Sequence, residues 1–120
     1  MAGKTKPVRW VGSSLRDLKT FPRSIQRHIG QALFAAQNGE EYPTVKALRG
    51  FGGRNVLEIV AADESGTYRA VYTVRFHDVI YVLHAFQKKA KRGIATPQRD
   101  IALVHRRLAD AERDYKEGQN

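Results

Sequence analysis

The chain has 120 residues, of which 42% are hydrophobic and 28% charged, so we expect one domain over residues 1–120 with one hydrophobic core. Lys and Arg number 21 against 12 Asp and Glu, and a net charge of +9 is typical of a protein that binds a polyanion such as a nucleic acid. Zero cysteines exclude disulfides and thiolate sites, and the four histidines lack metal-ligand spacing, so we expect no metal or cofactor. Without an apolar run that could span a membrane, or a signal peptide, we expect a cytoplasmic location.

The first third of the chain is predicted to form a short strand followed by a helical hairpin. The strand is expected at 8–11, after which Ser13 or Ser14 can cap a first helix. Pro22 can occupy the first position of a second helix. The apolar stripe of this second helix consists of Ile25, Ile29, Ala32, Leu33 and Ala36, and Asn38-Gly39 suits a left-handed C-cap.

From residue 45 the apolar period changes from 3.6 to 2, which predicts an antiparallel meander. Strands are expected at 55–60, 68–76 and 79–86, with turns at 62–66 and 77–78. The last of these strands is the most apolar and is therefore the expected centre of the sheet. Alternation in the middle strand places Arg69 and Arg75 on one face and Tyr72 on the other.

A final helix is predicted after the sheet. Thr96 can cap it and Pro97 can occupy its first position. Its apolar stripe consists of Ile101, Val104, Leu108, Ala111 and Tyr115. The expected fold class is therefore α+β, in the order strand, two helices, meander, helix.

Basic residues gather between residues 87 and 107, where Asp100 is the one acid. RNA cleavage without a metal ion requires stabilisation of a phosphorane with extra negative charge, and Arg and Lys suit that task. Arg69 is a candidate, with a solvated or ion-paired strand arginine as the alternative. The segment from Lys88 to Arg92 is another candidate, with a solvated turn that protects a sheet edge as the alternative.

Several segments carry a resemblance to a known family. They are Tyr-Arg-Ala-Val-Tyr-Thr-Val at 68–74, Val-Leu-His-Ala-Phe-Gln-Lys-Lys at 82–89 and Lys-Arg-Gly-Ile-Ala-Thr-Pro at 91–97. Together with Lys-Ala-Leu-Arg-Gly-Phe at 46–51, Leu-Glu-Ile at 57–59 and residues 7–14, they resemble the phage-derived branch of the RelE/HigB-like toxins. These toxins belong to bacterial toxin–antitoxin systems within the RelE/ParE superfamily. The resemblance covers nearly the whole chain.

The resemblance implies a helical hairpin packed on a small twisted antiparallel sheet with a C-terminal helix. It also implies a metal-independent mRNA endoribonuclease, or mRNA interferase, that works on the ribosome and is neutralised by a helix-turn-helix antitoxin. Arg69 matches the family's phosphate-contacting strand arginine, and Lys88 and Lys89 match its basic pair at the end of the last strand. The further residues expected to hold the RNA backbone are Arg54, Arg75, Lys91 and Arg92.

The residues for proton transfer stay open at this point. Where many RelE-type toxins have basic residues, this chain has Glu58 and Val60, and no tyrosine follows Lys89. Glu58 can accept a proton or form an ion pair with an arginine across the sheet. His84 has a suitable intrinsic pKa but lies in an apolar strand, where alternation places it with Ile80, Val82 and Phe86 and favours a structural role.

Two other functions remain open from the sequence. One is a non-catalytic toxin that resembles the ParE branch and inhibits DNA gyrase by binding it, which the missing proton-transfer residues favour. The other is a phage-derived nucleic-acid-binding protein without toxicity, which the composition permits. The Phe-Gln-Lys-Lys segment at 86–89 favours the endoribonuclease over the ParE-like toxin, and only the family resemblance disfavours the non-toxic protein.

Overall fold

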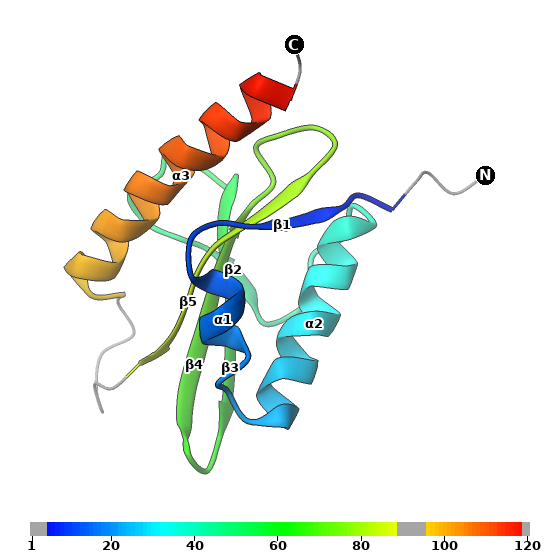
Figure 1. Ribbon diagram of the computed structural model, residues 1–120. Coiled ribbons are helices and arrows are strands. Elements are labelled where there is room, and N and C mark those ends of the chain that lie inside the picture. Colours follow the sequence, from blue (N-terminus) through cyan, green and yellow to red (C-terminus); the bar gives the residue numbers. More distant parts are fainter. Residues whose placement is uncertain (1–4, 89–95, 119–120) are drawn as a thin grey trace.

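The computed structural model describes residues 5–88 and 96–118, and shows a mixed sheet between two layers of helices (Figure 1). No helix in this part of the chain is long and apolar enough to cross a membrane. The elements in chain order are β1 (Val8–Trp10), α1 (Ser14–Leu18), α2 (Arg23–Gln37), β2 (Val45–Ala47), β3 (Val56–Asp63), β4 (Gly66–Thr73), β5 (Ile80–Lys88) and α3 (Gln98–Gly118). The predicted α+β class and the order of the elements are confirmed.

The strand order is β1-β5-β4-β3-β2. The meander from β2 to β5 is antiparallel as predicted, but β1 pairs parallel to β5, with Val8 opposite Ile80. The sheet is therefore mixed rather than antiparallel, and β4 rather than β5 lies in the middle. The parallel pairing is possible because the chain crosses one face of the sheet through α1 and α2 between β1 and the meander, whereas β4 is central because it pairs with both β3 and β5.

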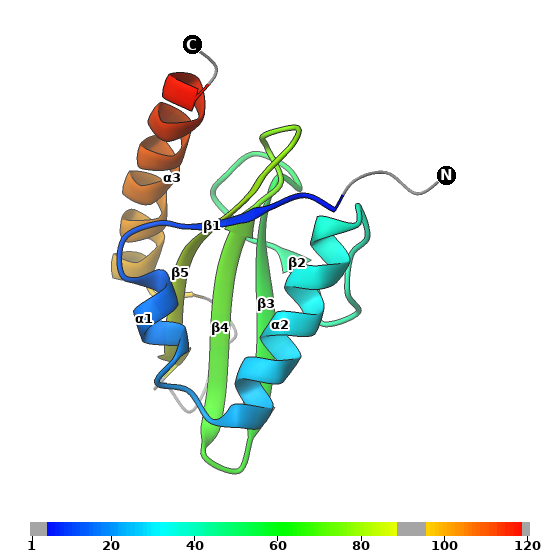
Figure 2. The ribbon, with the colours of Figure 1, turned by 45° about the vertical axis from the view of Figure 1, so that its right-hand side comes forward.

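Helices cover both faces of the sheet, as Figure 2 shows. On one face α1 and α2 form a core with the sheet that includes Ile29, Ile59 and Tyr72. On the other face α3 forms a second core that includes Val71, Leu83 and Val104. The predicted stripes of α2 and α3 are confirmed as the buried sides of these helices. Tyr72 lies on the face opposite α3, as alternation predicted.

The ends of α2 show how local sequence sets its limits. Pro22 is the N-cap, one position before its predicted place. At the other end, Gly39 has a φ of 79°, the N–H of Gly39 donates to the carbonyl of Ala36, and the N–H of Glu40 donates to the carbonyl of Ala35. These two bonds form a Schellman motif, which confirms the predicted left-handed cap and folds Glu40 back beside the end of the helix.

A β-bulge in β5 changes which side chains face α3. Val71 pairs with His84 but Tyr72 pairs with Val82, so Leu83 is an extra residue. Ile80 and Val82 face α2, whereas His84 and Phe86 stack on each other on the α3 side. The prediction that placed His84 on one face with Ile80 and Val82 is wrong because strict alternation does not allow for the extra residue.

The start of α3 differs from the predicted cap. The carbonyl of Pro97 accepts hydrogen bonds from the N–H groups of Asp100 and Ile101, so Pro97 precedes the helix rather than opening it. The hydroxyl of Thr96 donates to Glu58 of β3 instead of capping the helix. Thr96 therefore ties the start of α3 to the sheet.

Candidate active site

Charged side chains from four neighbouring strands meet on the α3 side of the sheet, toward the C-terminal end of β5. Lys46 of β2 pairs directly with Glu58 of β3. On β4 Arg69 is opposite Val60, two residues along β3 from Glu58, and Lys88 of β5 is opposite Thr67. Because side chains on a strand alternate with a period of two, these four residues share one face. We call Lys46, Glu58, Arg69 and Lys88 the charged cluster.

The centre of the charged cluster is a buried ion pair. Arg69 Nη1 donates to Glu58 Oε1 over 2.7 Å, and the side chains are only 5% and 1% exposed. Thr96 Oγ1 donates to the second oxygen, Oε2, over 2.6 Å, and Lys46 Nζ lies 3.9 Å from Oε1. Both carboxylate oxygens of Glu58 thus have partners, and the ion pair considered from the sequence is present. In this arrangement Glu58 holds the guanidinium of Arg69 in place.

The surroundings of Lys88 in the charged cluster perturb its protonation. Its side chain is buried, and this burial is the largest cause that lowers its pKa below 10.5. The positive charges of Arg69 and Lys46 lower the pKa of Lys88 further, while the carboxylate of Glu58 opposes them. An ammonium group with a lowered pKa gives up its proton more readily than an ordinary lysine, which suits a general acid.

His84 joins β5 to α3. Its Nε2 lies 2.7 Å from Asp100 Oδ1 in the first turn of the helix, and its ring stacks on Phe86 with centroids 4.7 Å apart. The imidazole is buried, and within residues 5–88 and 96–118 its Nδ1 has no hydrogen-bond partner. This geometry favours the structural reading of His84 over a role in proton transfer.

The structure does not bring every predicted site residue together. Arg54 precedes β3 and forms an exposed ion pair with Glu41, and Arg75 is exposed just beyond the end of β4. Val56 pairs with Thr73, so both arginines lie at the end of the sheet opposite Lys88. Lys89, Lys91 and Arg92 lie outside the described residues.

Sequence reasoning missed Lys46 and Thr96. Lys46 belongs to a strand of three residues, too short to show a period, and only the pairing of β2 with β3 connects it to Glu58. Thr96 stands in a Thr-Pro pair that is typical of a helix cap, and its bond to Glu58 spans 38 residues. Lys46 and Thr96 can be found only by asking which residues satisfy the carboxylate of Glu58.

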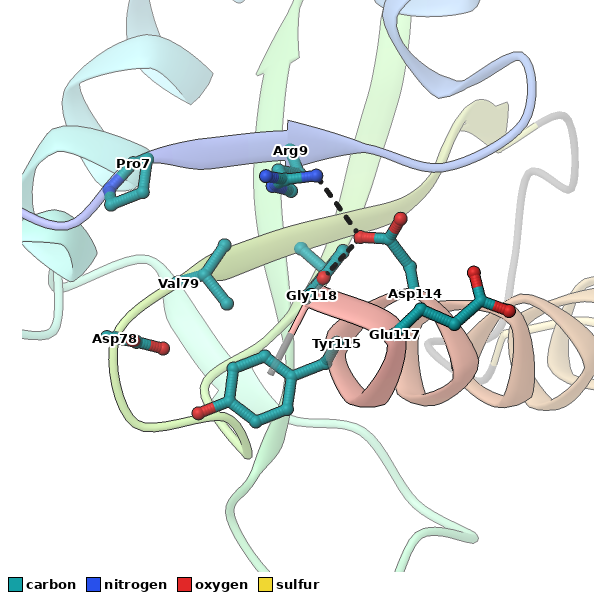
Figure 3. Close-up of a pocket in the computed structure, with 9 residues that line it drawn as sticks. Pro7, Arg9, Asp78, Val79, Asp114, Tyr115, Glu117 and Gly118 are labelled. Atoms are coloured by element: carbon teal, nitrogen blue, oxygen red, sulfur yellow. Dashed lines mark hydrogen bonds and ion pairs between the residues drawn. The ribbon is translucent and has the colours of Figure 1, made fainter. Parts of the chain in front are cut away.

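A hollow of about 450 Å³ lies at the other end of α3 (Figure 3). Asp114 accepts hydrogen bonds from Tyr81 over 2.6 Å and from Arg9 over 3.3 Å, and Asp78 and Glu117 also line the hollow. Burial, together with Asp114, raises the pKa of Tyr81 to about 12, so its phenol stays neutral. Three carboxylates repel phosphate, which leaves the charged cluster as the better anion site.

Among the described residues, no group of three or more His, Asp or Glu could hold a metal ion.

These features define a small basic α+β protein with a mixed sheet, helices on both faces and a charged cluster held by a buried ion pair. The chain belongs to the family described as phage derived protein Gp49-like (DUF891), whose model matches residues 16–109 and so includes Glu58, Arg69, His84 and Lys88. The resemblance to the phage-derived branch that the sequence motifs indicated is confirmed.

Solved structures with a similar fold include a free-state double-arginine mutant of the toxin RelE from E. coli. It has a TM-score of 0.52 and 16% sequence identity, and the match covers 73% of this chain and 88% of that one. The RelBE2 toxin–antitoxin complex from Mycobacterium tuberculosis contains a chain with a TM-score of 0.47 and 23% identity, over 71% of this chain and 100% of that one. No curated protein matches the chain. The RelE-like architecture implied by the sequence is confirmed.

Proposed function

We propose that the chain is the toxin of a toxin–antitoxin system and that it cleaves mRNA on the ribosome without a metal ion. The observation that carries this proposal is the charged cluster, in which three cations from three strands surround one buried carboxylate. The cluster therefore keeps excess positive charge in a partly desolvated place, where preformed cations stabilise developing negative charge best. The RelE-like fold and the net charge of +9 support the same reading.

In the proposed reaction, the ribose 2′-oxygen attacks the adjacent phosphorus and loses its proton to water. The bond from phosphorus to the 5′-oxygen breaks, and the Lys88 ammonium donates a proton to that oxygen. The neutral Lys88 amine then takes a proton from solvent. The products are a 2′,3′-cyclic phosphate and a 5′-hydroxyl. Lys46, whose side chain is 48% exposed, contacts the phosphorane, and the buried Arg69, held in place by Glu58, stabilises its charge from a greater distance. Lys89 also stabilises the charge on the phosphorane, and Lys91 and Arg92 hold the RNA backbone.

The proposed partner is a cognate helix-turn-helix antitoxin encoded beside the chain. A strongly basic protein that binds RNA favours an inhibitor of opposite potential, because such a partner associates fast and competes with a polyanion. We expect co-expression of this neighbour to abolish toxicity and to give a complex that survives gel filtration.

A test in cells separates the proposed function from its main rival. The wild-type chain and Lys88→Gln are each induced in a growing bacterium, and the ends of mRNA are mapped in both cultures. We expect fresh cuts within translated frames from the wild type and few from Lys88→Gln. Lys116→Gln is the matched control, since Lys116 is 74% exposed near the far end of α3, and it should cut like the wild type. Growth arrest with intact mRNA contradicts the proposal.

One observation favours a second candidate, a ParE-like toxin that binds DNA gyrase without catalysis. The Arg69 side chain is only 5% exposed and is paired with Glu58, so a phosphate cannot reach it freely in this conformation. For this candidate the same cultures would show double-strand DNA breaks and unchanged mRNA ends. A further alternative, a nucleic-acid-binding protein without toxicity, would leave growth unaffected.

A further inference from the structure

The outer face of α2 carries an apolar side chain that the core does not use. Phe34 is 61% exposed and is the one large hydrophobic side chain in the described residues that is exposed in this way. It lies outside the stripe that packs α2 on the sheet. A shallow hollow of about 670 Å³ surrounds it and is lined by Arg27, Gly30, Gln31, Phe34, Ala35, Glu40 and Tyr42. A single exposed aromatic is common on protein surfaces, so the hollow and the charges beside Phe34 decide what this face can bind.

Gly30 lies one helical turn before Phe34 and forms the open part of the hollow. A Cβ built on Gly30 would meet no atom within 4 Å, so the space above this residue is empty. Glycine within a helix costs about 1 kcal/mol relative to alanine, and neither turn geometry nor a close internal contact requires it here. The outer face of α2 therefore presents a protruding ring next to a gap.

Opposite charges flank the ring and the gap. Arg27 lies at one end of the hollow and Glu40, folded back by its bond to Ala35, lies at the other. Both residues are exposed, and neither forms an ion pair with another residue in 5–88 or 96–118. The order along the face is Arg27, Gly30, Phe34, Glu40. After a two-fold rotation this face is complementary to a second copy of itself, because each ring meets a gap and each charge meets its opposite.

We propose that two copies of this chain associate through α2, with the helices antiparallel about a two-fold axis. Phe34 of each copy lies over Gly30 of the other. In this alignment Arg27 of one copy lies level with Gln37 of the other, which is the last residue of α2. Glu40 lies beside that end of the helix, because its N–H donates to the carbonyl of Ala35. Each Arg27 thus faces a Glu40, and both pairs form at once, as a two-fold interface requires.

The size of the surface sets the expected strength. One helix face of 15 residues buries less area than the 1,200 Å² or so that stable specific complexes usually bury, so the dimer should be weak, with a dissociation constant in the micromolar range or above. Figure 2 shows α2 on one face of the sheet and α3 on the other. The charged cluster is on the α3 side, since Glu58 is opposite Val71 of the core under α3. Both copies of the proposed RNA site therefore remain accessible in the dimer.

Sedimentation velocity over a range of about 10 to 500 µM tests the proposal. We expect the wild type to shift from monomer toward dimer, and Phe34→Ala and Gly30→Leu to remain monomeric at every concentration. Arg106→Glu, an exposed charge reversal on α3, is the matched control and should associate like the wild type. A thermal melt checks that each variant is folded.

Charge exchange provides the sharper arm of the test. Arg27→Glu alone and Glu40→Arg alone each place two like charges opposite each other, so each should be monomeric. Mixed in equal amounts, these two variants should form a heterodimer, because both facing pairs are then attractive. A wild type that stays monomeric throughout, Phe34→Ala dimers as strong as the wild type, or a mixture that does not associate would overturn the two-fold arrangement.

Discussion

The buried pair of Glu58 and Arg69 gives a sharp prediction about stability. Removing one member of a buried ion pair typically costs 3 to 5 kcal/mol, because the other charge is left without compensation. In Arg69→Ala, the Glu58 carboxylate keeps the hydroxyl of Thr96 at 2.6 Å and the more distant ammonium of Lys46 at 3.9 Å. We therefore expect a loss at the lower end, about 3 kcal/mol.

This loss is large enough to measure by thermal and urea unfolding. With an unfolding entropy of about 2.1 cal/mol/K per residue, a chain of 120 residues should lose about 12 °C in Tm. The double variant Glu58→Leu/Arg69→Met removes both charges and keeps the volume, so it should recover most of the stability. Its coupling energy, taken from the double-mutant cycle, should exceed about 1 kcal/mol.

Two results would refute this reasoning. An Arg69→Ala variant within about 0.5 kcal/mol of the wild type would mean that the pair is not buried in solution. A double variant as unstable as Arg69→Ala would mean that packing rather than charge explains the loss. Arg75→Ala is the matched control, since this exposed arginine lies just beyond the end of β4, and it should have little effect.

The pKa of Lys88 is lower in the folded chain than its ordinary value of 10.5. Between these two pKa values the unfolded chain binds more protons than the folded chain, so the free energy of unfolding should rise as pH rises through this range. The rate of RNA cleavage should fall over the same pH range, because the Lys88 ammonium that serves as the acid loses its proton. Urea midpoints and cleavage rates measured over a pH series check the two trends, and Lys88→Gln should remove both. His84→Gln and Asp100→Asn should each cost about 1 to 2 kcal/mol, and the double variant little more than either, as their shared hydrogen bond predicts; additive losses in urea unfolding would count against that bond. Neutralising Lys91 and Arg92 together should flatten the log–log salt dependence of RNA affinity by about 1 to 2, and an unchanged slope in a fluorescence titration would assign them to edge protection.

Much of the fold could be predicted because the hydrophobic periods are strong. The stripe of α2 and the glycine after it specify a helix and its end, and the change of period at residue 45 specifies the meander. The partner of β1 could not be predicted in this way, because alternation tells which face a side chain takes and not which strand is its neighbour. The parallel pairing of β1 with β5 depends on how the hairpin of α1 and α2 crosses the sheet.

The site could be predicted only in part. An ion pair of Glu58 with Arg69 or Arg75 could be expected because side chains of opposite charge pair across neighbouring strands, but the sequence did not decide between the two arginines. The position of His84 could not be predicted, because the bulge at Leu83 leaves no mark in an unbroken apolar run. Lys46 was missed because its contact with Glu58 comes from strand pairing rather than from spacing.

The central claim is that the charged cluster cleaves RNA without a metal ion, and one measurement tests it directly. Purified chain is incubated with mRNA on translating ribosomes in magnesium buffer, and the chemical ends of the RNA fragments are determined. The account predicts cuts that leave 2′,3′-cyclic phosphate ends, and a rate roughly 10²-fold lower for Lys88→Gln than for Lys116→Gln. Intact RNA with the wild type, or equal rates for the two variants, would contradict it.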